Sequence, residues 1–412
     1  MSRSNYILLI VMFISCITMF SYYPFLVTYL NTSTYIGSDN VGLLMMIGVI
    51  SGSLLSLFSL LTLKVKDQSI GLIFSLTMFS LSLFIMGFIS TFDLYIIILA
   101  GVSLSIFIYR YAIGLYFTYS RSLQINCLST QSQKSLLFTR IKLVNSIGGA
   151  IGPLIGQYII NNYGHDYLFF TTSSLFALCA LIVLILRLSI PSREVKNSTI
   201  SNTRKNPKSF LATVTTELIN NPKFRYLTLG AMLHFTFEAQ LYTFISLNIE
   251  RTGIPNSIGL IFSLNAIVLI TIAILAGYFL KKISTYELSR HLIFIGSSMS
   301  CLAIILSMQA TNMTWLVIIV ILFSIGEFIT PQTCLDIITD IDKPVTQRLA
   351  VYNFFTSSLG MGLGFFIGGA LFSQANALLS TIVWITILMG IATCFYTSGQ
   401  HKEISEVNTE NQ

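Results

Sequence analysis

Twelve apolar runs, each close to the length of a membrane-crossing helix, constrain this chain more than any other feature. A helix needs about 20 predominantly apolar residues to cross the hydrocarbon core of a bilayer. The runs recur over all 412 residues, and the sequence therefore predicts an all-α membrane protein. They occupy residues 6–30, 41–63, 69–91, 94–119, 136–160, 167–187, 224–249, 257–280, 290–310, 313–338, 346–372 and 376–397.

The composition excludes a water-soluble globular protein. Only 9% of the residues are charged and 54% are hydrophobic, whereas soluble domains carry about a quarter charged residues. The first apolar run lacks a small-residue cleavage site and is too long for a signal-peptide core, so we expect it to be the first membrane helix. The six cysteines lie in or beside apolar runs without a CxxC pair, which favours packing over metal or redox roles.

The basic residues predict the orientation of the chain in the membrane. Cytoplasmic segments of membrane proteins are rich in Lys and Arg. With a cytoplasmic N-terminus, 21 of the 23 Lys and Arg residues fall in cytoplasmic segments or at the cytoplasmic ends of the runs, Arg251 falls outside and Arg110 lies within a span. This bias supports twelve spans with both termini in the cytoplasm. It also explains the net charge of +7 without a nucleic-acid partner.

A polar, basic segment in the middle of the chain predicts two halves. We expect an N-terminal six-helix bundle at 1–187, a cytoplasmic linker at 188–223, a C-terminal six-helix bundle at 224–397 and a cytoplasmic tail at 398–412. Parallel repeats of this kind are a recurring transporter design. A shift of 212 residues, without a gap, places Gly114, Thr118, Leu123, Gly148, Gly152 and Gly156 on Gly326, Thr330, Leu335, Gly360, Gly364 and Gly368.

The fifth run contains the segment NSIGGAIGPLIG, in which Gly148, Gly152 and Gly156 are spaced four residues apart. This spacing places them near one helix face, where a neighbouring helix can approach closely. Pro153 perturbs one backbone hydrogen bond and bends the helix. Close packing is expected in any case, and a role in gating is the further hypothesis.

These residues resemble the antiporter motif of the drug:proton exporters of the major facilitator superfamily. In that family the motif marks exporters, and the resemblance implies gating roles for Gly148, Gly152, Pro153 and Gly156. Arg110 and Gly114 have the R-x-x-x-G spacing of the family's helix 4 motif, which implies that Gly114 belongs to the same set. The segment SIGEFITP, which contains Glu327, resembles multidrug-type members together with Asn265 and Gln240.

The chain departs from that family at the cytoplasmic gate motif, which normally has a Gly followed by Asp-Arg. After the second run the sequence is SLLTLKVKDQS, which lacks both the Gly and the Asp in place, and Asp67 is a candidate substitute. After the eighth run, GYFLKKISTYE keeps Gly277 and the lysine pair but lacks the Asp. The coupling route is therefore expected to differ from that of the family.

Charged residues within the spans are the candidates for proton coupling or substrate binding. A charge at the centre of a membrane helix costs about 3 kcal/mol on insertion scales, so such residues face a wet cavity or a partner. Arg110, Glu238 and Glu327 are the strongest candidates, and His234 lies one turn before Glu238. Structural pairing is the alternative for Arg110 and Glu327.

The leading hypothesis is a proton-coupled antiporter of the multidrug-resistance type that exports a small organic molecule by alternating access. We expect a monomer in the bacterial cytoplasmic (inner) membrane, with the lipid bilayer, protons and the substrate as partners. Enzyme motifs are absent, and no catalytic residue, cofactor or metal is expected. The alternatives are a dedicated exporter of an endogenous siderophore or peptide antibiotic, a proton-coupled uptake symporter, and a non-transporting receptor or scaffold.

Overall fold

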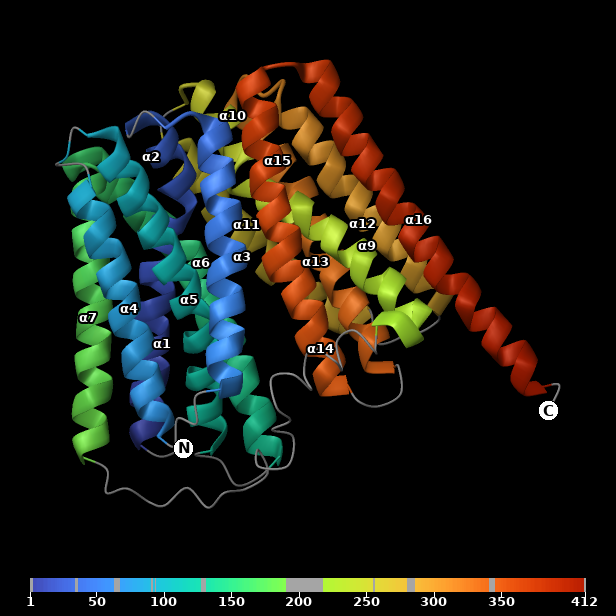
Figure 1. Ribbon diagram of the computed structural model, residues 1–412, viewed down its shortest axis with the longest axis horizontal. Coiled ribbons are helices and arrows are strands. Elements are labelled where there is room, and N and C mark those ends of the chain that lie inside the picture. Colours follow the sequence, from blue (N-terminus) through green and yellow to red (C-terminus); the bar gives the residue numbers. More distant parts are fainter. Residues whose placement is uncertain are drawn as a thin grey trace. The chain divides into compact units, whose positions relative to one another are not determined.

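The protein, seen here in a computed structural model, is built from helices throughout the residues that the structure describes (Figure 1). These are residues 3–33, 36–62, 67–89, 92, 94–126, 131–189, 218–254, 256–279, 286–340 and 345–410. Most of the predicted linker therefore lies outside the described residues, as do Cys127 and the lysine pair at 281–282. Helices satisfy the hydrogen bonds of their own backbone, which is the requirement for crossing lipid.

The first half of the chain forms seven α-helices and a short 3-10 turn, η1. They are α1 (Arg3–Tyr22), η1 (Tyr23–Phe25), α2 (Leu26–Ser33), α3 (Ser38–Thr62), α4 (Gln68–Ile89), α5 (Tyr95–Asn126), α6 (Gln131–Tyr163) and α7 (His165–Ser189). The first apolar run is interrupted at η1, where Pro24 provides no backbone N–H.

The second half repeats this pattern with further interruptions. Its elements are α9 (Pro222–Glu238), η2 (Ala239–Leu241), α10 (Phe244–Arg251), α11 (Ser257–Phe279), α12 (Tyr286–Ser307), α13 (Met313–Asp340), α14 (Val345–Phe354), the π-helix η4 (Phe355–Gly360), α15 (Met361–Gln374) and α16 (Ala377–Glu410). Asn221 caps α9, since its side chain accepts a hydrogen bond from the Phe224 N–H at 2.9 Å.

Eleven helices among the described residues are long and apolar enough to cross a membrane. They correspond to every predicted run except the seventh, 224–249. The seventh run instead forms two helices, α9 and α10, separated by the 3-10 turn η2. The count of twelve spans therefore stays a prediction at this segment, because it requires α9, η2 and α10 to cross the membrane together.

The helices group into two compact units. The first comprises Met1–Ile36, Ile47–Pro207 and Ile258–Ser263, and the second comprises Gly37–Met46, Lys208–Ser257 and Leu264–Gln412. In the first unit α1 packs against α6 and α7, and α4 packs against α5 and α7. In the second, α9 packs against α15 and α16, and α12 packs against α13 and α16.

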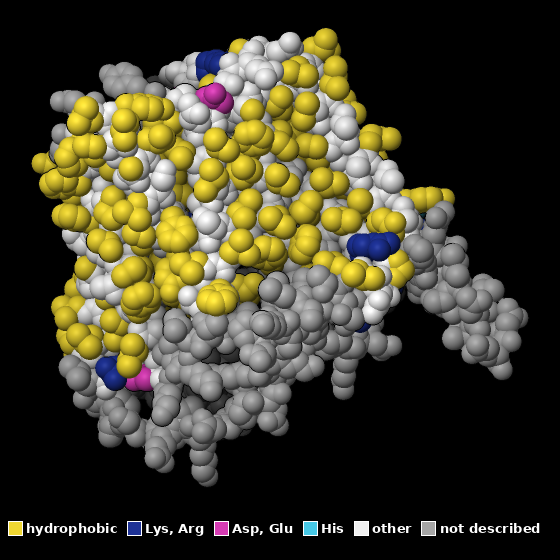
Figure 2. All heavy atoms as spheres, viewed as in Figure 1, with side chains coloured by type: hydrophobic (Ala, Val, Ile, Leu, Met, Phe, Trp, Pro, Cys, Tyr) yellow, Lys and Arg dark blue, Asp and Glu magenta, His cyan; other side chains and the backbone are white. Residues whose placement is uncertain are grey.

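The surface of these helices is apolar. Figure 2 shows hydrophobic side chains over most of the described surface on one face, with few charged side chains in view. Large side chains such as Ile47, Leu181 and Ile274 are half exposed. Apolar surface on this scale is typical of helices that face lipid. The protein is thus a multi-pass membrane protein.

Candidate functional site

A cluster of ionisable side chains lies within the second unit, where α9 places His234 and Glu238 one turn apart. The His234 side chain is completely buried, and its Nε2 lies 3.7 Å from Oε1 of Glu238. Its Nδ1 lies 3.0 Å from the hydroxyl of Ser297 on α12. Within the described residues, neither His234 Nε2 nor Glu238 Oε1 has a hydrogen-bond partner. The facing pair is therefore open to a proton or a polar ligand.

Two further residues complete this cluster from other helices. Asn265 on α11 donates a hydrogen bond from Nδ2 to Oε2 of Glu327 on α13, at 2.8 Å. Glu327 lies close enough to Glu238 for the charges of the two carboxyl groups to interact. We call His234, Glu238, Asn265, Glu327 and Ser297 the carboxylate cluster. The structure thus brings together four residues that the sequence singles out on three separate runs.

Gln240, which the resemblance groups with Asn265 and Glu327, makes hydrogen bonds to the backbone of neighbouring segments. It lies in η2, and its side-chain amide donates to the backbone oxygens of Thr236 and of Gly364 on α15, the latter at 2.9 Å. Its amide oxygen accepts from the Thr243 hydroxyl at 3.1 Å. Gln240 therefore ties the interrupted seventh segment to α15, and the helix α9 ends at Glu238 beside this tie.

A second group of polar side chains lies within the first unit, around Arg110 on α5. Arg110 is only 7% exposed. It donates a hydrogen bond from Nη2 to the Tyr23 hydroxyl, and its guanidinium carbon lies 5.2 Å from the centre of the Tyr23 ring. Gly52 of α3 makes this position possible, because a Cβ there would lie 2.7 Å from Cβ of Arg110.

Three tyrosines pack on one another beside Arg110. The Tyr109 ring stacks on Tyr23 with a centroid separation of 5.8 Å and meets Tyr22 edge to face at 5.5 Å. We call Arg110, Tyr22, Tyr23 and Tyr109 the Arg110–tyrosine cluster. Tyr22 is the last residue of α1 and Tyr23 is the first residue of η1, whereas Tyr109 directly precedes Arg110.

The predicted gating glycines form a packing face on α6. A Cβ on Gly148 would lie 2.8 Å from Cβ of Cys16, and one on Gly152 would lie 2.7 Å from the Ile17 carbonyl oxygen, both on α1. A Cβ on Gly156 would overlap the Ser21 carbonyl oxygen. Pro153 lies inside this helix.

The equivalent glycines of the second unit pack in the same way. Gly360 and Gly364 face Met232, Phe235, Thr236 and Ala239, and Gly368 faces Gln240 and Thr243. The 212-residue repeat therefore has a structural counterpart, in which each glycine face receives the interrupted first helix of its own half. Gly114 on α5 packs against Ser56 of α3.

The candidate substitute for the gate aspartate makes an ion pair within the first unit. Asp67, directly before α4, accepts a 2.7 Å hydrogen bond from Nε of Arg187 near the end of α7. Partial burial alone would raise the pKa of the Asp67 carboxyl, but the bonds from Arg187 and from the Ser69 N–H lower it below its ordinary value. Asp67 thus ties α4 to α7.

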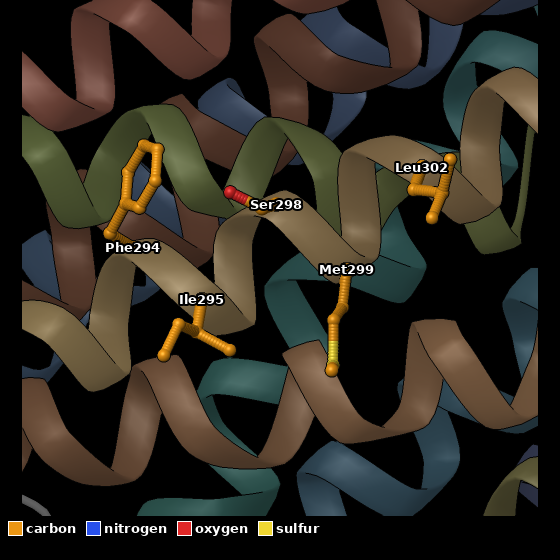
Figure 3. A pocket seen from close by; sticks show the side chains of 5 residues that line it. All are labelled: Phe294, Ile295, Ser298, Met299 and Leu302. Carbon is orange, nitrogen blue, oxygen red and sulfur yellow. The ribbon is translucent and has the colours of Figure 1, made fainter.

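Two other features of the described residues bear on what the chain can bind. No group of three or more His, Cys, Asp or Glu side chains among them is placed to hold a metal ion. A shallow hollow of about 310 Å³ lies on the surface of α12 (Figure 3) and is lined by Phe294, Ile295, Ser298, Met299 and Leu302. Three of these side chains are half exposed and apolar, which suits contact with lipid.

Comparison with known proteins identifies the family. The sequence model of the Major Facilitator Superfamily matches residues 8–365. The chain belongs to this superfamily. It is accordingly a membrane transporter. No curated protein sequence matches this chain significantly.

Solved structures of this superfamily's fold resemble the chain over almost its whole length. The nucleoside transporter NupG has a TM-score of 0.76 at 13% identity, with 96% of this chain and 99% of that chain covered. A POT family transporter in complex with 5-aminolevulinic acid has a TM-score of 0.70 at 13% identity, with 95% of each chain covered. A bacterial homolog of the human lysosomal transporter Spinster has a TM-score of 0.68 at 14% identity, with 97% and 98% covered. At these identities the likeness concerns the fold.

Proposed function

We propose that this superfamily member is a proton-coupled exporter that moves a small organic molecule out of the cell by alternating access. The carboxylate cluster carries the proposal. Glu238 and Glu327 interact through their charges, and a proton bound by the pair relieves their repulsion. Binding and release of that proton change the charge of the pair, and this change can drive the switch between the two conformations of alternating access. The proposed setting is the bacterial cytoplasmic membrane, with both termini in the cytoplasm.

His234 is proposed to relay protons to and from this pair. Its Nε2 faces Glu238, and its other ring nitrogen contacts Ser297, which fixes the orientation of the imidazole. The ring can therefore accept a proton from one side while it is held from the other. Asn265 orients Glu327 in the same manner through its amide.

The export direction is proposed from the glycine face of α6 and Pro153. The glycine face occurs in both units and serves helix packing in each. Pro153 has no equivalent, since the second unit has Phe365 at the corresponding position. The resemblance to antiporters therefore depends on Pro153 within this face, and this residue is proposed to bend α6 for the gate.

Proton coupling is tested in proteoliposomes that contain a pH-sensitive dye. A panel of fluorescent organic compounds of differing charge is screened for compound-driven proton movement. We expect the double variant Glu238→Gln, Glu327→Gln to lose this movement while it still exchanges the compound in the absence of a gradient. Asp166→Asn, which alters a carboxylate at the start of α7, is the control. Proton movement that persists in the double variant would refute the coupling role.

The direction of transport is tested in everted and right-side-out membrane vesicles. An exporter accumulates its substrate in energised everted vesicles, and an uptake symporter does so in right-side-out ones. Accumulation confined to right-side-out vesicles would replace export by uptake.

A further inference from the structure

Hydrogen-bond donors converge in the Arg110–tyrosine cluster. A guanidinium group carries five N–H donors and no acceptor, and the Tyr23 hydroxyl accepts from Nη2 of Arg110. The charge of Arg110 also acts on the side chains of Tyr22 and Tyr109, so all three phenols lie within its electrostatic reach. The cluster is thus a set of donors around one buried positive charge.

Two of these tyrosines bury their hydroxyl groups as well as their rings. Tyr22 and Tyr109 are 1% and 3% exposed, and their two hydroxyls lie beside each other without another hydrogen-bond partner in the described part of the chain. When two hydroxyls have only each other, one O–H donor stays unused, and phenylalanine would pack the same ring without the cost of burying it. Water, an ion or a bound ligand completes a buried donor of this kind, and the neighbouring charge of Arg110 favours an anionic ligand.

The chemistry of the donors selects the ligand. A guanidinium matches a carboxylate, whose two oxygens accept hydrogen bonds in one plane, and phenol hydroxyls donate readily to the same oxygens. One positive charge balances one carboxylate, whereas a phosphate group brings up to two negative charges. A neutral amide offers one acceptor oxygen and no charge, and it would bind more weakly.

We propose that the Arg110–tyrosine cluster binds the carboxylate of an organic acid, which makes organic anions or zwitterions the substrate class of this transporter. The binding site stands on its own, and only its role in substrate choice rests on the proposed function. Arg110 supplies the charge, Tyr22 and Tyr109 supply hydroxyl donors, and Tyr23 holds the guanidinium in place.

Binding is measured by equilibrium dialysis of purified full-length protein, with radiolabelled benzoate, phenylacetate and 4-phenylbutyrate as probes. The three corresponding amides serve as neutral, nearly isosteric comparisons. We expect at least one carboxylate to bind the wild-type protein about tenfold or more tightly than its amide. Failure of all three carboxylates to bind in preference to their amides would overturn the proposal.

The hydroxyls are tested with the double variant Tyr22→Phe, Tyr109→Phe. We expect its Kd for the carboxylate to rise about tenfold or more, because two hydrogen bonds to a charged group are lost. Its unliganded melting temperature should equal or exceed that of the wild type. The control is Tyr29→Phe, which removes another buried hydroxyl without a partner among the described residues, one that packs against His165 and Phe169. An equal effect of the two changes on the Kd would refute the site.

Arg110 is tested by substitution with Gln and with Lys. We expect Arg110→Gln to abolish the preference for carboxylate over amide, and Arg110→Lys to retain a weaker preference because the charge remains. A preference that survives in Arg110→Gln would overturn the proposal. Dialysis uses no proton gradient, so it tests this site independently of proton coupling. A failed coupling assay with intact carboxylate binding refutes only the proposed function. Intact coupling without carboxylate binding refutes only this site.

Discussion

Individual side chains in the carboxylate cluster are held by neighbours that the sequence does not reveal. His234 and Glu238 are predictable as a pair, because residues four apart share a helix face. Ser297 is not, since its contact with His234 depends on how α12 packs beside α9. Gln240 lies in η2 and bonds to the backbone of α15, a contact that its place in the seventh run does not reveal. Its position follows from the end of α9, which no proline marks.

Ser297→Ala should destabilise the protein and disturb proton handling together. The change removes the hydrogen-bond partner of a completely buried imidazole, and we expect a loss of about 1–3 kcal/mol. Thermal unfolding of the purified protein measures the first effect, and the pH dependence of proton movement in proteoliposomes measures the second.

Ser298→Ala is the matched control for that change. Ser298 is the next residue on α12, but it lines the shallow surface hollow (Figure 3). We expect an effect within about 0.5 kcal/mol and an unchanged pH profile. Equal effects at the two positions would show that Ser297 does not position His234.

The Asp67–Arg187 pair should make the protein less stable as the pH falls. Because the pKa of folded Asp67 lies below its ordinary value of 3.8, the unfolded chain binds the proton more tightly. The pair's contribution is therefore complete above pH 3.8 and is lost as the pH falls below it. Both side chains are 39% exposed, so the contribution is at most about 1 kcal/mol.

Asp67→Asn should remove this contribution. The melting temperatures of wild type and variant are compared between pH 6 and pH 3, where the wild-type advantage should shrink toward zero. An advantage that grows on acidification would contradict the assignment.

At the scale of single elements, most helices were predictable because a long apolar run has one stable solution in lipid. The interruptions were not predicted. In the seventh segment the apolar run continues past Glu238, so the sequence does not mark the change to η2, where Gln240 bonds to the backbone of α15. The helix that packs on the glycine face of α6 could not be predicted either, because the spacing of the glycines does not indicate which helix covers them.

Gly156→Ala should disrupt the packing of α6 on α1. The added methyl group would overlap the Ser21 carbonyl oxygen, a backbone atom that cannot move aside. Overpacking of this kind costs about 1–3 kcal/mol or more. We expect a lower melting temperature and a lower yield of folded protein.

Gly390→Ala on α16 is the control for that substitution. The new methyl group would lie 3.2 Å from the end of the flexible Leu233 side chain, which can move. It should be tolerated with little change in melting temperature. A variant of Gly156 as stable as this control would refute the close contact.

At the scale of the whole molecule, the distribution of Lys and Arg predicts a topology that enzyme fusions can test. Alkaline phosphatase is active only outside the cytoplasm. Fusions at Gly164 and Asn312 should be active, and a fusion after Ser189 should be inactive. The reverse pattern would place both termini outside.

A fusion at Gly253 addresses the interrupted seventh segment. If α9, η2 and α10 cross the membrane together, phosphatase at Gly253 is active. If the segment does not cross, this fusion is inactive, and an odd number of spans follows. The outcome decides between twelve crossings and eleven.

The two halves share their glycine faces and differ in their chemistry. Gly148, Gly152 and Gly156 receive the first helix of one unit, and their counterparts receive the first helix of the other, yet the Arg110–tyrosine cluster belongs to one unit and the carboxylate cluster to the other. The 212-residue repeat therefore includes the packing faces and not the charged side chains. It follows that the segments with the glycine faces can be exchanged between the halves. The charged side chains of the two clusters, in contrast, can each occupy only their own half.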